Sequence, residues 1–451
     1  MAESLARALL SEPTLAAVFS DAALLAALLR FEAALARAEA DAGVIPASAA
    51  AVIERVCTEP GFDAHALTLE ARASATHGVA VVRALTTAVR AVDEQAAGFV
   101  HWGATSQDLV DTALALQIKQ AGTVLAAALT GLAQAAIALA EAHPGTIALG
   151  RTLLQPAAPI LLAQKFAGWA LALAEARREF KASLGQAVIL QFGGAVGNLA
   201  VLGGNAEQVA RRLAEHLHLS WPGYARHALR GPMARLGGAC ALAGGTVAKI
   251  ARDITLAMQF EVGELSEPAL PGRGGSSALP HKRNPAACVL VLAAAQRLPA
   301  LAATLYAALP QEHERGVGGW QVELPTLVDS LETLGSAVFA LTPVLRGLIV
   351  HDAALAQNLA RTHGLAQSEM LTAALAARIG KVRAQAWMER LVARVHAEHI
   401  TLIEAADQDA ELTQLLGTAE ITTALRPENA LGASTAMIRR MLERTRALLA
   451  D

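Results

Sequence analysis

Two hydroxyls, a lysine and an asparagine lie within the eleven residues from Gly275 to Pro285. The segment reads Gly-Ser-Ser-Ala-Leu-Pro-His-Lys-Arg-Asn-Pro, and two more glycines precede it. Glycine favours a mobile loop, whereas Asn284 followed by Pro285 predicts the N-cap and first residue of a helix. The free N–H groups at a helix N-terminus attract anions. The segment therefore predicts a loop that presents hydroxyls and a cation to an anionic ligand; the alternative is a glycine-rich turn before a buried helix.

Two other stretches have the same character. Thr105-Ser106-Gln107-Asp108 places hydroxyls before an acid, as at the first turn of a helix, and His101 precedes it. Thr152-Leu153-Leu154-Gln155 fits a T-x-x-Q capping box, and Arg151 precedes it. Three such helix starts, each beside a cationic or polar side chain, indicate a small polyanionic substrate such as a di- or tricarboxylate.

The elements that would position these residues are helices. Of the 451 residues 54% are hydrophobic but only 4% are aromatic, because alanine and leucine supply most of the apolar content. These residues are strong helix formers, so the chain is predicted to be all-α. We expect a helical N-terminal domain over residues 1–107, a central bundle of about five long helices over 108–350, and a helical C-terminal domain over 351–451.

Composition argues against several classes of protein. The net charge of −3 gives no basic surface for nucleic acid. Cys57, Cys240 and Cys288 are far apart in sequence, and no secretory signal is visible, so a cytoplasmic protein with reduced thiols is expected. The pairs His216/His218 and His396/His399 offer no third ligand at a useful spacing, so no metal is expected.

Residues 121–140 carry no charge, and this length could cross a bilayer. The stretch is mostly alanine, with threonine, glutamine and glycine interspersed. Small residues favour close helix packing, so a helix buried in a bundle is preferred to a membrane span. A long uncharged helix also indicates a surface that other subunits cover.

The segment 275–285 resembles the G-S-S-x-M-P-x-K-x-N-P signature of the fumarase/aspartase superfamily, with Leu279 in place of methionine. Residues 101–108 and 150–155 resemble the first and second characteristic regions of that superfamily. The resemblance implies a central bundle of long helices flanked by two smaller helical domains. It also implies a homotetramer in which each active site draws on three subunits, with no cofactor.

Within the superfamily, two features resemble its cycloisomerases. Leu153 stands where the lyases usually carry a histidine, and residues 311–320 look like the cycloisomerase run Q-E-H-E-R-x-x-G-G-W. This branch implies closure of 3-carboxy-cis,cis-muconate to 4-carboxymuconolactone in protocatechuate breakdown, by the β-ketoadipate pathway. A fumarate-releasing lyase, for adenylosuccinate or argininosuccinate, is the alternative that Leu153 disfavours. A non-catalytic structural relative is a second alternative, which the intact Ser276, Lys282 and Asn284 disfavour.

The resemblance also implies roles for particular residues. Ser276 is the expected proton-transfer group, while Lys282 and Asn284 hold the substrate carboxylate that gains electron density. A run like W-H-T-Q-R-D-R in related enzymes is matched here only by His227 and Arg230. Nucleophile and acceptor belong to one substrate molecule, so the protein must mainly orient it and stabilise charge. The residues expected to bind substrate are His101, Thr105, Ser106, Arg151, Gln155, Ser277, His313, Arg315, His227 and Arg230.

Overall fold

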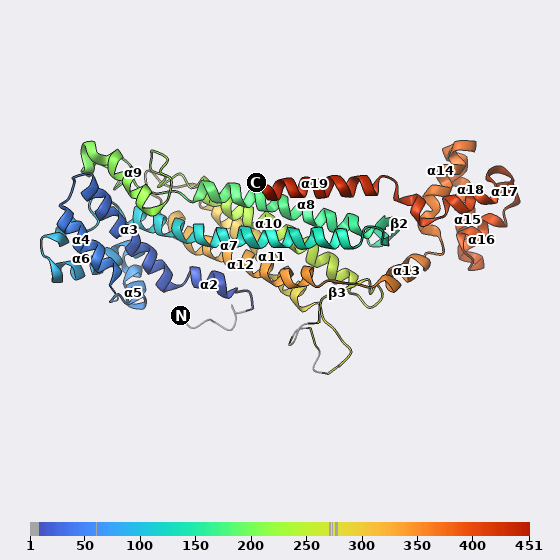
Figure 1. The fold of residues 1–451 in the computed structure, drawn as a ribbon, viewed down its shortest axis with the longest axis horizontal. Coiled ribbons are helices and arrows are strands. Elements are labelled where there is room, and N and C mark those ends of the chain that lie inside the picture. Colours follow the sequence, from blue (N-terminus) through green and yellow to red (C-terminus); the bar gives the residue numbers. More distant parts are fainter. Residues whose placement is uncertain (1–8, 60, 270–271, 273, 276–277) are drawn as a thin grey trace. The chain divides into compact units, whose positions relative to one another are not determined.

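The computed structural model describes residues 9–451 except 60, 270–271, 273, 276 and 277, and it is almost entirely helical (Figure 1). Five helices contain between 22 and 37 residues, which confirms the predicted all-α class and the set of long helices. They are α7 (Ser106–Ala142), α8 (Leu162–Ala187), α10 (Gly231–Ala257), α11 (Ala286–Ala307) and α12 (Gly319–Arg346).

Shorter helices precede, interrupt and follow these five. Those before residue 220 are α2 (Pro13–Val18), α3 (Asp21–Asp41), α4 (Ala47–Thr58), α5 (Ala64–Ser74), α6 (His77–Val92), η1 (Ala96–Phe99), η2 (Ala200–Asn205) and α9 (Ala206–Leu217). Those after residue 350 are α13 (Asp352–Ala360), η3 (Leu365–Gln367), α14 (Ser368–Ile379), α15 (Lys381–Glu398), α16 (Leu402–Asp407), α17 (Ala410–Leu416), α18 (Thr418–Ala424), η4 (Pro427–Leu431) and α19 (Ser434–Ala450).

The chain divides into two compact units, and each consists of three segments. The first unit comprises Met1–Leu129, Ala176–Ala248 and Leu290–Phe339; the second comprises Thr130–Glu175, Lys249–Val289 and Ala340–Asp451. Each of the five long helices contributes residues to both units. The expected division at residues 107 and 350 stays a prediction.

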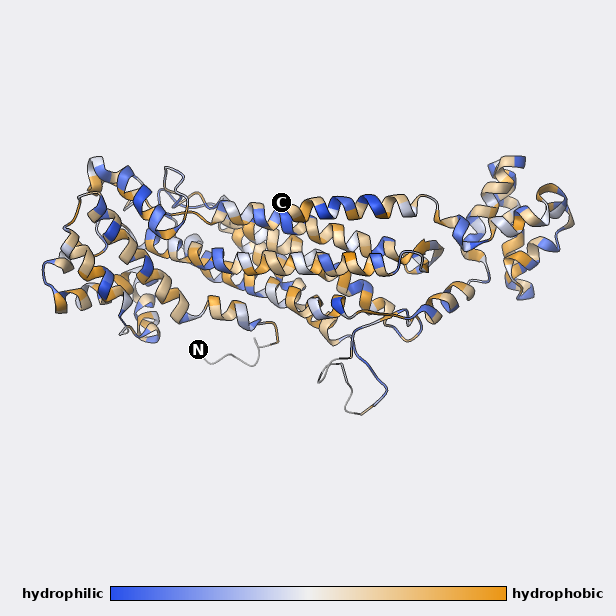
Figure 2. Ribbon diagram, in the orientation of Figure 1, coloured by the Kyte–Doolittle hydropathy of each residue, from blue (hydrophilic) through white to orange (hydrophobic). Residues whose placement is uncertain are grey.

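The first unit has a core in which α3, α4, α6 and α9 pack with the start of α7. Phe31, Ile53, Leu85 and Leu109 are fully buried there. In the second unit α14 to α18 form a separate, smaller core around residues such as Leu391. Figure 2 shows apolar residues along α7 and α11, whereas α19 carries many polar ones.

Glycine allows close helix packing within the first unit. A Cβ added at Gly237 or at Gly244 of α10 would lie 2.2 Å from Leu305 or Leu298 of α11, respectively. These glycines are seven residues apart, as are the two leucines, so each leucine occupies the space above one glycine. The alternation of small and large residues explains why α10 and α11 can pack closely.

Three helices, α7, α11 and α12, are long and apolar enough to cross a membrane, judged by length and composition alone. Within this chain α7 is buried on one face, where Leu125, Leu129 and Ala133 are inaccessible to solvent. The opposite face is exposed and carries no charge between residues 121 and 140. Its exposed residues are Thr123, Ala127, Gln134 and Ala138.

Residues 147–161 form a β-hairpin, so the helix start predicted at Thr152 is wrong. Strand β1 (Ile147–Thr152) pairs antiparallel with β2 (Gln155–Leu161), and α8 begins only at Leu162. Leu153 and Leu154 connect the strands with φ values of 50° and 66°, as a two-residue hairpin turn requires. Prolines at 156 and 159 exclude a helix here, and they outweigh the local capping-box pattern. A second small sheet pairs β3 (Leu265–Ser266) with β4 (Ile349–Val350).

Candidate active site

Arg315 joins the N-terminus of α7 to the turn before α12. Its Nη1 donates to Thr105 Oγ1 at 2.7 Å, and its Nη2 donates to Ser106 Oγ at 3.2 Å. Its Nε donates to Gln107 Oε1 at 3.3 Å. All three acceptors are neutral, so none of these contacts cancels the guanidinium charge. A hydroxyl that accepts one bond can still donate its own hydrogen, so the cluster offers donors and positive charge to an anion.

The turn that presents Arg315 is closed by its own side chains and backbone. Glu312 Oε2 accepts a hydrogen bond from the Val317 N–H at 2.7 Å. His313, predicted to bind substrate, is exposed on this turn and has a left-handed φ of 48°. The contact between Glu312 and Val317 orders the turn that presents Arg315.

Asp108 holds the first turn of α7 in place through several hydrogen bonds. Its Oδ1 accepts from Gly193 N at 3.0 Å and lies 2.7 Å from His227 Nε2, and its Oδ2 accepts from Gly194 N at 2.8 Å. Oδ2 also accepts from the Thr105 N–H at 3.1 Å. The carboxylate is fully buried, so these bonds replace its hydration. Asp108 therefore positions Thr105 and Ser106, the two hydroxyls that contact Arg315.

His101 lies four residues before Thr105 and is paired with a buried acid. Its Nδ1 is 2.6 Å from Oε1 of Glu32 on α3, whose side chain is 1% exposed. Burial alone would lower the pKa of His101, but the charge and hydrogen bond of Glu32, with a further effect of Asp108, raise it overall. The predicted substrate-binding histidine thus belongs to the same unit as Arg315.

Arg151, in the second unit, is placed differently from Arg315. Its Nη1 and Nη2 donate to Glu264 Oε2 and Oε1 at 2.9 and 2.6 Å, a bidentate ion pair. Asn358 Nδ2 also donates to Glu264 Oε1, at 2.8 Å. The Arg151 side chain is 30% exposed, but its charge is neutralised by this pair. Gln155 is exposed at the start of β2, opposite Thr152.

The segment around residue 280 is held at both ends of its described part. Asn284 N donates to Gly274 O at 2.8 Å, and Lys282 N donates to Leu279 O at 3.0 Å. Gly274 has a φ of 71°, and an added Cβ would lie 2.7 Å from Asn284 O, so glycine is required there. Lys282 is exposed and Asn284 is half-buried. Ser276 and Ser277, predicted to transfer the proton and bind substrate, lie outside the described residues.

The helix start predicted at Asn284 and Pro285 is correct to within one residue, since α11 begins at Ala286. Its free N–H groups are not left for a ligand. Glu267 Oε1 accepts from Cys288 N at 2.8 Å, and Oε2 accepts from Ala287 N at 3.3 Å. The helix terminus binds an anion as predicted, but the anion is a carboxylate of the protein.

His227 and Arg230, predicted to bind substrate, are buried and paired with acids of the protein, and their part in binding stays a prediction. His227 is 3% exposed and its Nε2 contacts buried Asp108. Arg230 is 4% exposed and is paired with Asp111 and with Glu323. Burial would lower the pKa of Arg230, but these two acids raise it. A guanidinium with both faces paired in the interior is a structural element of the protein.

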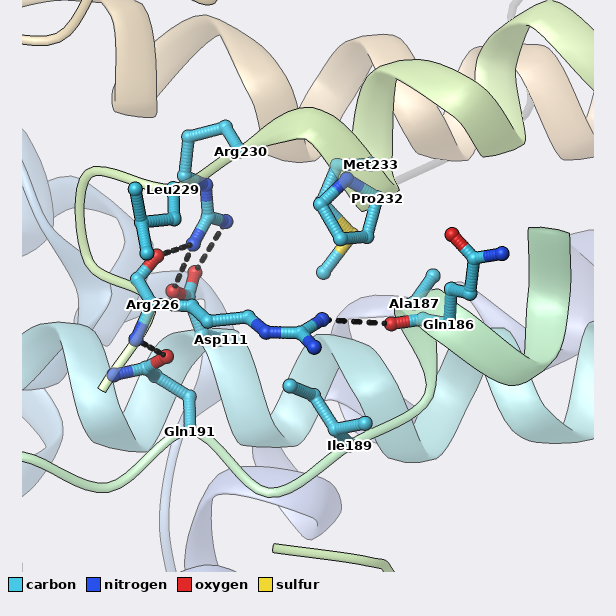
Figure 3. Close-up of a pocket in the computed structure, with 10 residues that line it drawn as sticks. All are labelled: Asp111, Gln186, Ala187, Ile189, Gln191, Arg226, Leu229, Arg230, Pro232 and Met233. Atoms are coloured by element: carbon cyan, nitrogen blue, oxygen red, sulfur yellow. Dashed lines mark hydrogen bonds and ion pairs between the residues drawn. The ribbon is translucent and has the colours of Figure 1, made fainter. Parts of the chain in front are cut away.

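Figure 3 shows the small cavity beside Arg230, with Asp111, Gln191 and Arg226 around it. Its volume is about 20 Å³, enough for one water molecule. Arg226 Nη1 donates to Gln186 O at 3.1 Å, and the Arg226 N–H donates to Gln191 Oε1 at 2.8 Å. A tricarboxylate cannot enter this space, which supports the structural role of Arg230.

Sequence reasoning missed the acids that position the site. Glu32, Asp108 and Glu264 were not among the expected site residues. Each nevertheless forms a hydrogen bond or ion pair with one of those residues: His101, Thr105 and Arg151, respectively. One signal was available for Asp108, which lies two residues after the hydroxyl pair of the α7 start. No local signal marks Glu32 or Glu264, because their partners are 69 and 113 residues away in sequence.

Comparison with known proteins agrees with this architecture. Residues 9–299 match the model of the lyase family. The chain is 42% identical to a 3-carboxy-cis,cis-muconate cycloisomerase of Bradyrhizobium diazoefficiens, over 96% of each chain. It is 39% identical to a nitrosuccinate lyase of Streptomyces davaonensis, over 94% of this chain and 91% of that one.

A solved structure is also similar, the 3-carboxy-cis,cis-muconate lactonizing enzyme from Pseudomonas putida. Its TM-score is 0.92 at 36% sequence identity, and the match covers 98% of this chain and 99% of that chain. The match thus extends over nearly the whole of both chains. The chain therefore belongs to the lyase family, within the fumarase/aspartase superfamily.

Proposed function

We propose that the protein is a cycloisomerase that closes 3-carboxy-cis,cis-muconate to 4-carboxymuconolactone. Similarity along the whole chain to a cycloisomerase and to a lactonizing enzyme supports this activity. The observation that carries the proposal is Leu153, which lies at the tip of the β1–β2 hairpin with 97% of its side chain exposed. The fumarate-releasing lyases usually place a histidine there, and leucine cannot transfer a proton.

Substrate binding is the first task of the proposed site. The substrate carries three carboxylates, and Arg315 with the hydroxyls of Thr105 and Ser106 offers a cationic set of donors for one of them. His101 offers a second donor in the same unit. In the proposed assembly Lys282 and Asn284 bind the carboxylate on which charge builds up.

The chemical step needs charge stabilisation and one proton. A substrate carboxylate oxygen adds to one carbon of a double bond, and the π electrons move into the conjugated carboxylate. The resulting aci-carboxylate dianion is stabilised by Lys282 and Asn284, and Ser276 delivers a proton to the neighbouring carbon. Bond order and charge balance without an oxidant, so we propose that no cofactor takes part.

We also propose a homotetramer in which each active site combines residues of three subunits. The exposed face of α7 supports this assembly, since residues 121–140 present an uncharged surface over five helical turns. The three free cysteines Cys57, Cys240 and Cys288 are compatible with the proposed cytoplasmic location. Light scattering tests the assembly, and a monomer would contradict the shared site.

An absorbance assay tests the activity. The diene of 3-carboxymuconate absorbs in the ultraviolet and the lactone does not, so we expect purified protein to abolish the absorbance. Nitrosuccinate, adenylosuccinate and argininosuccinate are tested in parallel by chromatography. Turnover of any of these three, without loss of muconate absorbance, would replace the proposal with a lyase activity.

Ser276→Ala is the decisive variant for the mechanism. We expect turnover to fall by about 1,000-fold or more, because the proton donor is lost. Ser48→Ala is the matched control, since Ser48 is an exposed serine of α4, and it should keep full turnover. Near-normal turnover of Ser276→Ala would remove the serine from this role.

A further inference from the structure

We propose that Glu32 is a positioning residue that keeps His101 in its imidazolium form, so that His101 binds a substrate carboxylate as a fixed cation and does not transfer the proton. The inference rests on the proposed function. It assigns a part in the reaction to a buried acid of α3 that contacts no ligand. It also separates the role of His101 from that of Ser276.

The geometry pairs the Nδ1 atom of His101 with Glu32 and leaves the Nε2 atom for a ligand. His101 Nδ1 lies 2.6 Å from Glu32 Oε1, a distance that indicates a charge-assisted hydrogen bond. The backbone of His101 has a left-handed φ of 60°, which is uncommon for residues other than glycine. Since Nδ1 donates to Glu32, Nε2 is the nitrogen that can meet a substrate near Thr105.

The buried charge around Glu32 requires compensation. Among the described residues, Glu32 Oε2 and both side-chain oxygens of Glu39 have no hydrogen-bond partner. Glu39 is seven residues further along α3 and fully buried, so the two acids share one helix face. Burial, reinforced by the charge of Glu32, raises the pKa of Glu39 to about 9, so Glu39 is neutral at pH 7. Glu32 then carries the negative charge that His101 neutralises.

The groups that face His101 favour its charged form. Glu32 of α3 and Asp108 of α7 are both acids, and their effect exceeds that of burial, which would lower the pKa of His101. Asp108 is itself shared with His227, which lies 2.7 Å from it. Beyond Glu32 lie Glu39 and Cys57, whose raised pKa values keep both uncharged at pH 7.

An imidazolium suits binding better than proton transfer in this pair. Its Nε2–H donates a charge-assisted hydrogen bond to a carboxylate, and such bonds are about twice as strong as neutral ones. A general acid must release its proton near the working pH, whereas Glu32 opposes that release. Loss of the Glu32 charge should therefore weaken substrate binding and leave the chemical step almost unchanged.

Kinetics of Glu32→Gln across pH test this assignment. At pH 7.5 we expect KM to rise about tenfold while kcat changes less than threefold, since about 1.4 kcal/mol of binding is lost. The ratio of variant to wild-type KM should decrease as the pH is lowered from 7.5, because a lower pH favours the imidazolium even without Glu32. Glu39→Gln is the matched control on the same helix face, and its KM should equal that of the wild type.

A second measurement is independent of activity. The carbon resonance of His101 in protein labelled at histidine Cε1, assigned with His101→Asn, should remain that of an imidazolium above the pH at which an ordinary histidine titrates. Titration of wild-type His101 near pH 6.5 would overturn the proposal, even if Glu32→Gln fails to fold. A loss of kcat in Glu32→Gln at unchanged KM would overturn it by making His101 a proton donor. If the wild type does not convert 3-carboxymuconate, the proposed function fails and the resonance alone decides the charge of His101.

Discussion

Arg315 and Arg151 are both arginines expected to bind substrate, and the structure gives them opposite surroundings. Arg315 donates to neutral oxygens of Thr105, Ser106 and Gln107, so its charge remains available. Arg151 donates both terminal nitrogens to the carboxylate of Glu264. The difference shows that residue type does not decide the role of an arginine. The charge of its acceptors does.

Replacement of Arg315 should have the largest effect. We expect Arg315→Gln to lower kcat/KM by about 100- to 1,000-fold, because a charge-assisted contact to the substrate carboxylate is lost. Its thermal midpoint should stay within a few degrees of the wild type, since no buried acid is left unpaired. Arg439→Gln, at a position with 71% side-chain exposure, is the control and should match the wild type in both measurements.

Replacement of Arg151 should instead reduce stability. Arg151→Gln removes the cationic partner of the Glu264 carboxylate, whose side chain is 7% exposed. The free energy of unfolding should therefore fall by about 2–4 kcal/mol. The double variant Arg151→Gln/Glu264→Gln should regain most of this loss in denaturant titrations. Equal destabilisation of the single and double variants would show that the ion pair is not what Arg151 contributes.

Glu39 extends the comparison to an acid for which the described residues offer no cation. Its pKa of about 9 in the folded protein exceeds that of an exposed glutamate, so the folded state binds the additional proton between about pH 4.5 and 9. Stability therefore falls as pH rises through this window, by up to about 1.4 kcal/mol per pH unit. Glu39→Gln removes this dependence and should gain stability relative to the wild type from pH 5 to pH 8. If the free energies of unfolding of the wild type and of Glu39→Gln changed with pH in parallel, Glu39 would not be the source of this dependence.

The smallest effect is expected at the hairpin beside Arg151. Leu154 has a φ of 66°, which glycine adopts without strain, so Leu154→Gly should stabilise the protein by about 1 kcal/mol. Leu154→Ala is the control, because it removes the exposed side chain but keeps the strain. The two thermal midpoints should differ, and identical midpoints would argue that the turn is unstrained.

The long helices could be predicted from sequence because their signal is local. Runs of alanine and leucine, ended by His143-Pro144-Gly145, define α7 without reference to any partner. The α7 start and the cluster of hydroxyls at Thr105 and Ser106 were also predicted. The hairpin was not predicted because the T-x-x-Q pattern favours a helix start. The prolines at 156 and 159, which argue against a helix, are the stronger signal.

The pairings inside the site could not be predicted, since they join distant parts of the chain. Whether Arg230 faces substrate or two acids depends on Asp111 and Glu323, which are 119 and 93 residues away. The same holds for Arg151 and Glu264. Sequence spacing identifies groups that can carry charge, and only the fold decides which of them are already neutralised.

Asp108 has a consequence for the order of folding. Its carboxylate joins α7 to Gly193, Gly194 and His227, at sequence separations of 85, 86 and 119 residues. Contacts this distant in sequence form slowly, because the intervening chain must first close a long loop. We expect the helices to form early and the hydroxyl cluster at Thr105 to reach its final arrangement only at the end. Hydrogen exchange of the Gly193 and Gly194 amides during refolding should therefore lag behind that of mid-α7.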